Sequence, residues 1–294
     1  MKLLAAVFAG VLCSLAQEGT GPYPAIYESD PGLPTHTVYR AKNLRAVKGR
    51  MPLLSWGNGA CANNGLAHKN YLLEIASHGF LAIAIGPPAN PPPARTEPGA
   101  TTPRPPATGP ATKSTQLIDA INWAIAENGR KGSPYYKKID TGRIAVMGMS
   151  CGGIQTYAVA TDPRIRMLGI WNSGILKTPI RPNAPIMEDV RKDQLDKLRT
   201  PIFYVMGDKS DIAFENGLDD FNRVTKVPSI HMYRDGVGHG GTYGQPNGGE
   251  FGKVGVALLK WQLKGDKESG RMFLGDRCGF CQDSAWHVSK KGYK

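Results

Sequence analysis

The sequence predicts an α/β fold with a mostly parallel central sheet and helices on both faces. Two observations predict it. Apolar runs of strand length alternate with helical patterns from residue 50 onward, and a serine box bounded by glycines lies between one such run and a helix. Strands that are separated by helices pair in parallel, and their connections cover both faces of the sheet.

The expected elements follow one another in a regular order. Residues 80–85 are apolar at every position, which is typical of a strand buried on both faces. Residues 115–127 carry apolar side chains at helical spacing. The predicted strands are 52–56, 80–85, 143–147, 167–171, 201–206 and 229–233, and the predicted helices are 66–77, 115–127, 153–160 and 254–263.

A proline-rich segment interrupts this alternation between residues 87 and 110. It holds ten prolines, which exclude a regular helix or an inner strand, so we expect a long surface loop beside the carboxyl edge of the sheet. The chain segment before it is too short to form a separate hydrophobic core. We therefore expect one α/β domain over residues 17–294, with a cysteine-containing extension from about residue 266 to 294 as a C-terminal cap.

The amino terminus has the pattern of a secretory signal peptide over residues 1–16. Lys2 precedes the apolar run 3–12, and the small residues Ser14 and Ala16 end the segment. This run is too short to cross a bilayer, and no other segment reaches that length. The expected mature protein begins at Gln17, is secreted to the extracellular space and has no membrane partner.

The charge balance limits the possible partners. The net charge is +12, and it becomes +11 once Lys2 is removed. The basic residues are scattered, and neither a zinc finger nor an aromatic single-strand motif is present, so nucleic acid is not an expected partner. Electrostatic adsorption to anionic surfaces and an ordinary charged, soluble surface both remain open.

The sequence Gly148-Met-Ser-Cys-Gly152 predicts a nucleophile. A strand, a tight turn and a helix around a G-x-S-x-G box form a nucleophile elbow, which exposes the serine at the edge of the sheet. Cys151 is a rival nucleophile, but an elbow shifted by one residue needs glycine where Met149 stands. Ser150 is therefore the candidate.

A serine hydroxyl needs a base, and the base needs an orienting acid. His239 is the best candidate base because it lies in a glycine-rich loop directly after the last predicted strand. The acid is expected between serine and histidine in the chain, and residues 207–213 offer Asp208 and Asp211. We prefer Asp211, because Asp208 directly follows Gly207 and is typical of a turn residue.

The tetrahedral intermediate of such a site needs two backbone N–H donors. The Cys151 amide is one, and the loop after strand 52–56 supplies the other, with Asn58 as first choice and Gly59 as second. This placement puts Cys61 beside Cys151, so a disulfide between them is expected, leaving Cys278 to pair with Cys281. A metal site is not expected, because no second cysteine or histidine pair completes a zinc site with Cys278 and Cys281.

Three residues after the strand 167–171 are candidates for a substrate pocket. Trp171, Asn172 and Ile175 follow the carboxyl end of that strand, on the expected side of the active site. For Trp171, burial in the core is the alternative interpretation.

The ordered motifs Trp56-Gly-Asn-Gly59, Gly148-Met-Ser-Cys-Gly-Gly153, Asp211-Ile-Ala213 and Gly238-His-Gly-Gly241 resemble secreted α/β-hydrolase esterases of the cutinase, polyester hydrolase and dienelactone hydrolase kind. The resemblance covers roughly residues 35–265. It implies an α/β-hydrolase fold and a serine carboxylic ester hydrolase without a cofactor, acting through an acyl-enzyme on a small or polymer-linked ester.

The chain departs from the polyester hydrolases of this group at two places. Asn58 stands where those enzymes usually carry an aromatic residue, and the proline-rich loop is longer, so polymer hydrolysis is not implied. Two other functions remain open. The same three residues serve peptidases and acyltransferases, and the fold also hosts non-catalytic binding proteins.

Overall fold

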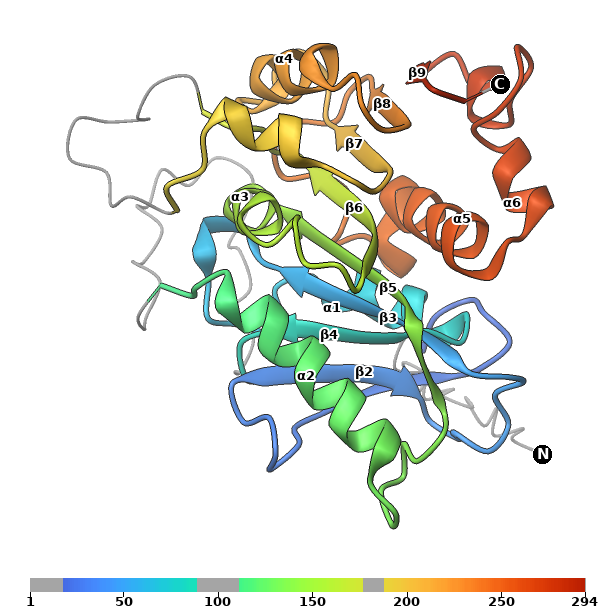
Figure 1. Ribbon diagram of the computed structural model, residues 1–294. Coiled ribbons are helices and arrows are strands. Elements are labelled where there is room, and N and C mark those ends of the chain that lie inside the picture. The colour runs from blue at the N-terminus through green and yellow to red at the C-terminus, as the bar shows by residue number, and fades with distance from the viewer. Residues whose placement is uncertain (1–17, 89–110, 177–187, 294) are drawn as a thin grey trace, which may run out of the picture.

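The computed structural model of the protein describes residues 18–88, 111–176 and 188–293. Within these residues, nine strands form one sheet in the order β1-β2-β4-β3-β5-β6-β7-β8-β9 (Figure 1). The strands are β1 Ala25–Glu28, β2 His36–Ala41, β3 Met51–Gly57, β4 Leu81–Ile85, β5 Ile139–Met149, β6 Ile165–Trp171, β7 Ile202–Met206, β8 Ser229–Arg234 and β9 Trp286–Lys291. The α-helices are α1 Lys69–Ser77, α2 Thr115–Gly129, α3 Cys151–Ala158, α4 Phe214–Arg223, α5 Gly249–Lys264 and α6 Lys267–Arg271.

The centre of the sheet is parallel. Strands β3 to β8 all run in the same direction, whereas β1, β2 and β9 pair antiparallel to their neighbours at the two sides. The carboxyl ends of the parallel strands therefore meet at one edge of the sheet. In folds of this kind the connections that leave this edge carry the functional groups.

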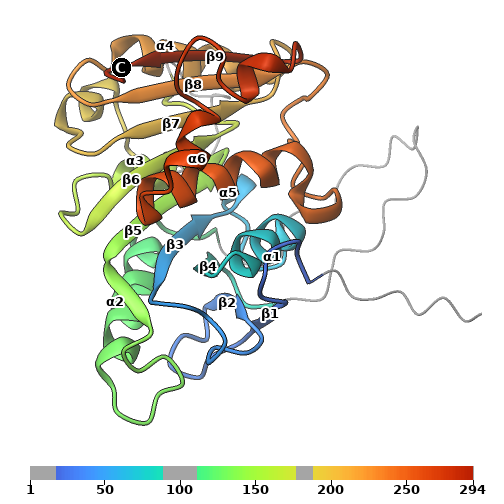
Figure 2. The same ribbon diagram turned by 90° about the vertical axis from the view of Figure 1, so that its right-hand side faces the viewer.

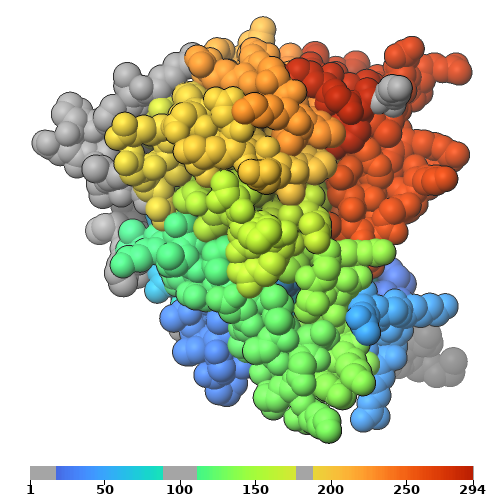
Figure 3. All heavy atoms as spheres, in the orientation of Figure 1, coloured from blue at the N-terminus to red at the C-terminus, as the bar shows by residue number. Residues whose placement is uncertain are grey.

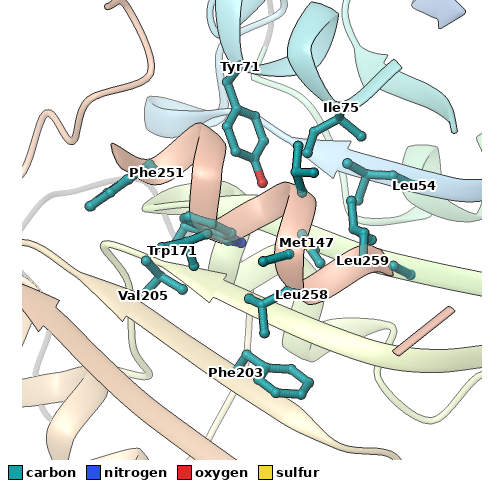
Figure 4. Packing of buried hydrophobic residues seen from close by; sticks show 14 of the residues in the cluster. Leu54, Tyr71, Ile75, Met147, Trp171, Phe203, Val205, Phe251, Leu258 and Leu259 are labelled. Atoms are coloured by element: carbon teal, nitrogen blue, oxygen red, sulfur yellow. The ribbon is translucent and has the colours of Figure 1, made fainter. Parts of the chain in front are cut away.

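Helices cover both faces of this sheet (Figures 1 and 2). Helices α1, α5 and α6 lie on one face, and α2, α3 and α4 lie on the other. Strand β7 is an example of a strand that is buried on both faces. Phe203 and Val205 pack toward α5, while Ile202 and Tyr204 pack toward the opposite face, so every position of the strand suits a large hydrophobic side chain. Figure 4 shows Phe203 and Val205 together with Trp171 on the α1 and α5 side.

The predicted α/β class with a mostly parallel sheet and helices on both faces is confirmed. Each predicted strand and helix has a counterpart, and the largest boundary differences are at α5, which begins at Gly249 instead of residue 254, and at β5, which begins at Ile139 instead of residue 143. Strands β1, β2 and β9 and helices α4 and α6 were not predicted. Buried His36 and Thr37 break the apolar pattern of β2, and α4 is mostly polar with Gly217 inside it.

The C-terminal segment differs from the expected cap. Strand β9 pairs with β8 and extends the sheet, and the side chains of Phe273, Phe280 and Trp286 belong to the same core as Trp171. In Figure 3 the red atoms of this segment lie directly against the orange atoms of the preceding part of the chain. These side chains of the C-terminal segment are therefore part of the central packing.

Two sequence predictions fall outside the described residues. These are the signal peptide at 1–16 and nearly all of the proline-rich segment at 87–110. In the part of the chain that is described, none of the helices has the length and the apolar character needed to cross a membrane.

Candidate active site

Ser150 lies in a sharp turn between β5 and α3. Its backbone has φ 52° and ψ −114°, a conformation that L-residues rarely adopt. The turn requires glycine around it, because a Cβ on Gly148 would lie 2.3 Å from the Gly152 carbonyl and a Cβ on Gly152 would lie 2.1 Å from the Gly57 carbonyl oxygen. Strand β3, strand β5 and helix α3 thus approach in backbone contact, and Ser150 is the residue between them that is not buried.

The end of β6 holds the backbone of Ser150 on both sides. The Ser150 amide donates a hydrogen bond to the Trp171 carbonyl at 2.9 Å, and the Ser173 hydroxyl donates to the Ser150 carbonyl at 2.7 Å. The strained turn is fixed by these two bonds. The Ser150 hydroxyl is left to contact another group.

That group is His239, from the loop after β8. Its Nε2 lies 3.1 Å from the Ser150 Oγ, and its Nδ1 lies 2.6 Å from Oδ1 of Asp211. Both distances are those of hydrogen bonds, so serine, imidazole and carboxylate form one continuous chain. With the Nδ1 proton directed at the carboxylate, Nε2 is free to accept the serine proton.

Asp211 follows β7 and has no exposed side-chain surface. Its Oδ1 also accepts a hydrogen bond from the Ala213 amide at 2.9 Å, and its Oδ2 accepts from the Asn172 side chain at 2.8 Å and from the Gly207 amide at 3.2 Å. Burial alone raises the pKa of the Asp211 carboxyl, but the bonds from His239, Ala213 and Asn172 outweigh it and hold the pKa below its usual range. Asp211 therefore faces His239 as a carboxylate.

Asp208, the alternative acid, has different partners. Its Oδ1 accepts from the amide of Ser210 at 2.8 Å and from the hydroxyl of Ser210 at 2.6 Å, and its Oδ2 accepts from the Gly236 amide at 2.9 Å. These contacts make it the turn residue that joins the loop after β7 to the loop after β8. The contact with His239 belongs to Asp211.

The two loops expected to supply oxyanion donors lie against one another. The Gly152 amide donates to the Asn58 carbonyl at 3.0 Å. The Asn58 side-chain NH₂ group donates to the carbonyls of Ala62, Asn64 and Ile85 at 3.1, 2.9 and 2.7 Å. The Asn58 side-chain NH₂ group thus holds this loop together and ties it to the end of β4.

Both expected disulfides are present in the structure. Cys61, in the 3-10 turn after β3, is bonded to Cys151 at the start of α3, with their Cα atoms 5.2 Å apart. Cys278 is bonded to Cys281, which leaves neither thiolate for a metal. The first bond ties the loop that contains Asn58 to the residue that follows Ser150.

The three expected pocket residues are not exposed beside Ser150. Trp171, Asn172 and Ile175 are each 0% exposed. Trp171 packs among the rings of Trp56, Tyr71 and Phe251, and Ile175 lies in the core on the other face of the sheet. Their position at the carboxyl end of β6 places these three residues near Ser150. Their side chains are nevertheless buried, so they do not line an open pocket.

Two further residues contact this hydrogen-bonded group: Asn172, which the sequence suggested as a pocket residue, and Tyr243, which the sequence did not single out. Asn172 bonds the acid, and the Tyr243 hydroxyl donates to the Asn172 side-chain oxygen at 2.7 Å. Both side chains are buried. The only sequence feature that could have pointed to them is their position in loops at the carboxyl edge of the sheet. A sequence pattern does not show which neighbouring loop such a side chain meets.

The other five histidines have contacts of their own. They are His36 with the Gln116 carbonyl, His68 with Trp56, His78 with Glu74, His231 within a group of aromatic rings, and His287 with Asp235. Among the residues that the structure describes, no three histidine, cysteine, aspartate or glutamate side chains gather in a way that would hold a metal ion.

Comparison with known proteins identifies the group to which the chain belongs. No curated protein matches it significantly. A family model does: that of the PETase family, described as PET hydrolase-like, matches residues 70–268 and so spans more than half of the chain, from α1 to α6. The matched region contains Ser150, Asp211 and His239. The protein is therefore a member of the PETase, or PET hydrolase-like, family of α/β-hydrolases, an esterase group.

Proposed function

We propose that the protein is an exported serine esterase in which Ser150 is the nucleophile, His239 the general base and Asp211 the orienting acid. The observation that carries the proposal is the hydrogen-bonded chain from the Ser150 Oγ through both nitrogens of His239 to Asp211. A strained turn that exposes the serine at the carboxyl edge of the sheet supports it.

The geometry leads to a two-stage reaction. His239 Nε2 takes the Ser150 proton as Oγ attacks the ester carbonyl, and Asp211 stabilises the imidazolium that forms. The tetrahedral oxyanion receives hydrogen bonds from the backbone amides of Cys151 and Asn58. His239 then protonates the leaving alcohol, and the acyl-enzyme is released by a water molecule that His239 activates in the same way.

The substrate proposed is a carboxylic ester with an apolar group next to the scissile bond. Ile212, directly after the acid, is 76% exposed, which is unusual for a large apolar side chain. It offers an exposed apolar side chain directly after Asp211 in the chain. Both a small ester and an ester group on a polymer meet this requirement, and the feruloyl and cutin-like classes do so better than an acetyl ester.

Export is part of the proposal. The pattern of residues 1–16 supports a cleaved signal peptide that leaves residues 17–294 as one catalytic domain. The bonds Cys61–Cys151 and Cys278–Cys281 support an oxidising compartment, because such bonds persist mainly outside the cytosol.

The test begins with a fluorophosphonate probe, which labels activated serines. We expect labelling at Ser150 and hydrolysis of p-nitrophenyl esters, both lost in Ser150→Ala and His239→Ala. Turnover is expected to fall by roughly 10⁶-fold in each variant, because members of such a chain act as a unit. Ester hydrolysis that survives in Ser150→Ala would refute the assignment.

A substrate panel then separates the possible activities. Acetyl, feruloyl, glucuronoyl and longer-chain esters are compared with an anilide and with a competing alcohol acceptor. Hydrolysis of the esters is expected. Preferred cleavage of the anilide would make the protein a peptidase, and preferred transfer to the alcohol an acyltransferase.

A further inference from the structure

Three consecutive residues at the end of β6 hold both Ser150 and Asp211. The Trp171 carbonyl and the Ser173 hydroxyl bind the backbone of Ser150, and between them the Asn172 side chain donates to Oδ2 of Asp211 at 2.8 Å. The nucleophile and the acid come from different loops. This segment is a common support that sets one relative to the other.

The orientation of the Asn172 side chain is set by Tyr243. The Tyr243 hydroxyl donates to the Asn172 Oδ1 at 2.7 Å, so the NH₂ group of the same amide must face Asp211. The reversed amide would direct its oxygen at a carboxylate and leave the hydroxyl without an acceptor. Because Asn172 and Asp211 are buried and Tyr243 is 2% exposed, water does not compete for these bonds.

Tyr243 is itself firmly placed. Its ring lies among those of Trp56, Tyr71 and Phe251, with centroids 5.9, 5.6 and 5.3 Å away. Burial raises the pKa of Tyr243 well above its ordinary value, so the hydroxyl keeps its proton and remains a donor. A rigid aromatic group therefore determines which atom of Asn172 meets the acid.

Tyr243 and His239 also belong to the same loop. His239 binds Oδ1 of Asp211 directly, and Tyr243 reaches Oδ2 through Asn172. The loop thus restrains both oxygens of the Asp211 carboxylate, one directly and one through Asn172. Rotation of Asp211, which would break its contact with the imidazole, is opposed from both sides.

We propose that Asn172 and Tyr243 are positioning residues of the active site: Tyr243 orients the Asn172 amide, and Asn172 holds Asp211 so that its other oxygen meets His239. This inference rests on the proposed function. The backbone of Asn172 agrees with it, because its φ of 42° is a conformation that asparagine adopts more readily than most residues and that glycine adopts freely.

Two variants and one control test the proposal. Tyr243→Phe removes only the hydroxyl that orients Asn172, and Asn172→Gly removes the amide while tolerating the backbone conformation. Tyr71→Phe is the matched control: the Tyr71 hydroxyl is buried in the same aromatic group (Figure 4), yet it has no hydrogen-bond partner among the described residues.

For Tyr243→Phe and Asn172→Gly we expect kcat to fall about tenfold with KM unchanged, because a slightly misplaced acid misaligns the base but not the substrate. The acid limb of the pH–rate profile should move up by about 0.5 to 1 pH unit. Asn172→Gly removes one donor from Asp211, and Tyr243→Phe frees the amide that supplies this donor, so in both variants the carboxylate keeps more negative charge and favours protonated imidazole. The ionisable side chains facing Asp211 in the described structure are His239 and Tyr243, and those facing Tyr243 are Tyr71 and His68.

Tyr71→Phe is expected to match the wild-type protein in kcat and in pH profile. The double variant Asn172→Gly/Tyr243→Phe is expected to be no slower than Asn172→Gly, because the hydroxyl acts only through the amide. The same series is repeated with the rate of fluorophosphonate labelling, which needs no knowledge of the substrate. Melting temperatures are measured alongside to separate folding from catalysis.

The outcomes distinguish this proposal from the proposed function. A wild-type protein that neither labels at Ser150 nor cleaves any ester contradicts the proposed function itself. In an active wild-type background, three results would overturn the positioning role: an unshifted acid limb in both variants, equal losses in Tyr243→Phe and Tyr71→Phe, or multiplicative losses in the double variant.

Discussion

Asp208 and Asp211 stand three residues apart, yet their surroundings give them different roles. Asp208 is partly exposed and caps turns in two loops. Asp211 is buried and receives four hydrogen bonds, one of them from His239. The two carboxylates therefore differ in role because the loop after β7 buries the side chain of Asp211 and leaves that of Asp208 at the surface.

This difference predicts unequal effects of removing each charge. Asp211→Asn should lower kcat by about 10⁴-fold, because the amide no longer fixes the imidazole with Nε2 free to accept a proton. Asp208→Asn should change kcat less than tenfold and lower the melting temperature instead. Steady-state kinetics of the two purified variants decide the matter, and the reverse order would assign the acid to Asp208.

A second residue-scale prediction concerns His231, a buried histidine of β8. Burial lowers its pKa to about 4, whereas an unfolded chain gives histidine a pKa of about 6.5. Below a pH of about 6.5, His231 is protonated in the unfolded chain but stays neutral in the folded protein. The stabilisation is therefore complete above that pH and is lost as the pH falls toward about 4, by up to about 3 kcal/mol.

The variant His231→Phe should flatten this dependence. The side chain lies among aromatic rings, with Phe214 and Phe221 at 5.8 and 5.6 Å between centroids, so phenylalanine suits the environment. Urea unfolding at neutral and acidic pH measures the difference in unfolding free energy, with the exposed His287→Phe as control. An equally steep loss of stability in His231→Phe would contradict the assignment.

At this scale the sequence indicates the residues that follow a motif or a chain order. Ser150 is marked by its glycines, and Asp211 and His239 by their order after it. Tyr243 is not indicated and Asn172 is indicated only as a pocket residue, because the contact between them joins loops that are 71 residues apart in the chain. Such a contact has no local pattern.

At the scale of elements, the alternation of apolar runs was enough to predict strands β3 to β8, because both faces of each are covered. The side strands were missed for the opposite reason. Strand β9 has the sequence WHVSKK, whose polar residues suit a strand at the side of a sheet and give no continuous apolar signal. The antiparallel pairing of such a strand depends on a partner elsewhere in the chain.

The loop after β3 and the start of α3 act as one unit because a disulfide joins Cys61 to Cys151. The bond closes a sequence separation of 90 residues, for which the chain-entropy model gives about 4 kcal/mol. Mild reduction should lower kcat before the fold melts, since it loosens the two amides proposed to bind the oxyanion. Turnover and near-UV circular dichroism are followed together as reductant is added.

The other disulfide provides the control for this experiment. The variant Cys278→Ala/Cys281→Ser lacks a bond that spans a sequence separation of only three residues and lies in the C-terminal segment. Its turnover should equal that of the wild-type protein and should show the same sensitivity to reductant. A variant Cys61→Ser/Cys151→Ala with unchanged kcat would show that the bond does not support the oxyanion donors.

At the scale of the whole molecule, basic side chains are scattered along the sequence, yet among the described residues several of them lie at the edge of the sheet opposite to Ser150. The segments that lead into the parallel strands carry several basic side chains, and the segment before β3 carries the most of those named below. These side chains are Arg45, Lys48 and Arg50 before β3, Lys137 and Lys138 before β5, Arg199 before β7 and Lys226 before β8.

This asymmetry predicts adsorption to anionic surfaces with Ser150 facing outward. Binding to carboxylated particles should weaken as salt rises from roughly 0.01 M to 1 M, over which the Debye length shrinks from about 30 to 3 Å. Lys48→Glu/Arg50→Glu should weaken adsorption more than Lys69→Glu/Lys209→Glu, which makes the same change of charge at the carboxyl edge. Equal weakening would show that only net charge matters.

The position of Phe273, Phe280 and Trp286 in the same core as Trp56 and Trp171 has a consequence for the order of events during synthesis. A ribosome makes the centre of the sheet first and these three side chains last. Helices α1 and α5 of this face are made earlier, but its core is not complete until residue 286 has been added, so the native packing there must wait for that residue. This order suits the export proposed above, because a chain whose core is still incomplete can be threaded through a translocation pore.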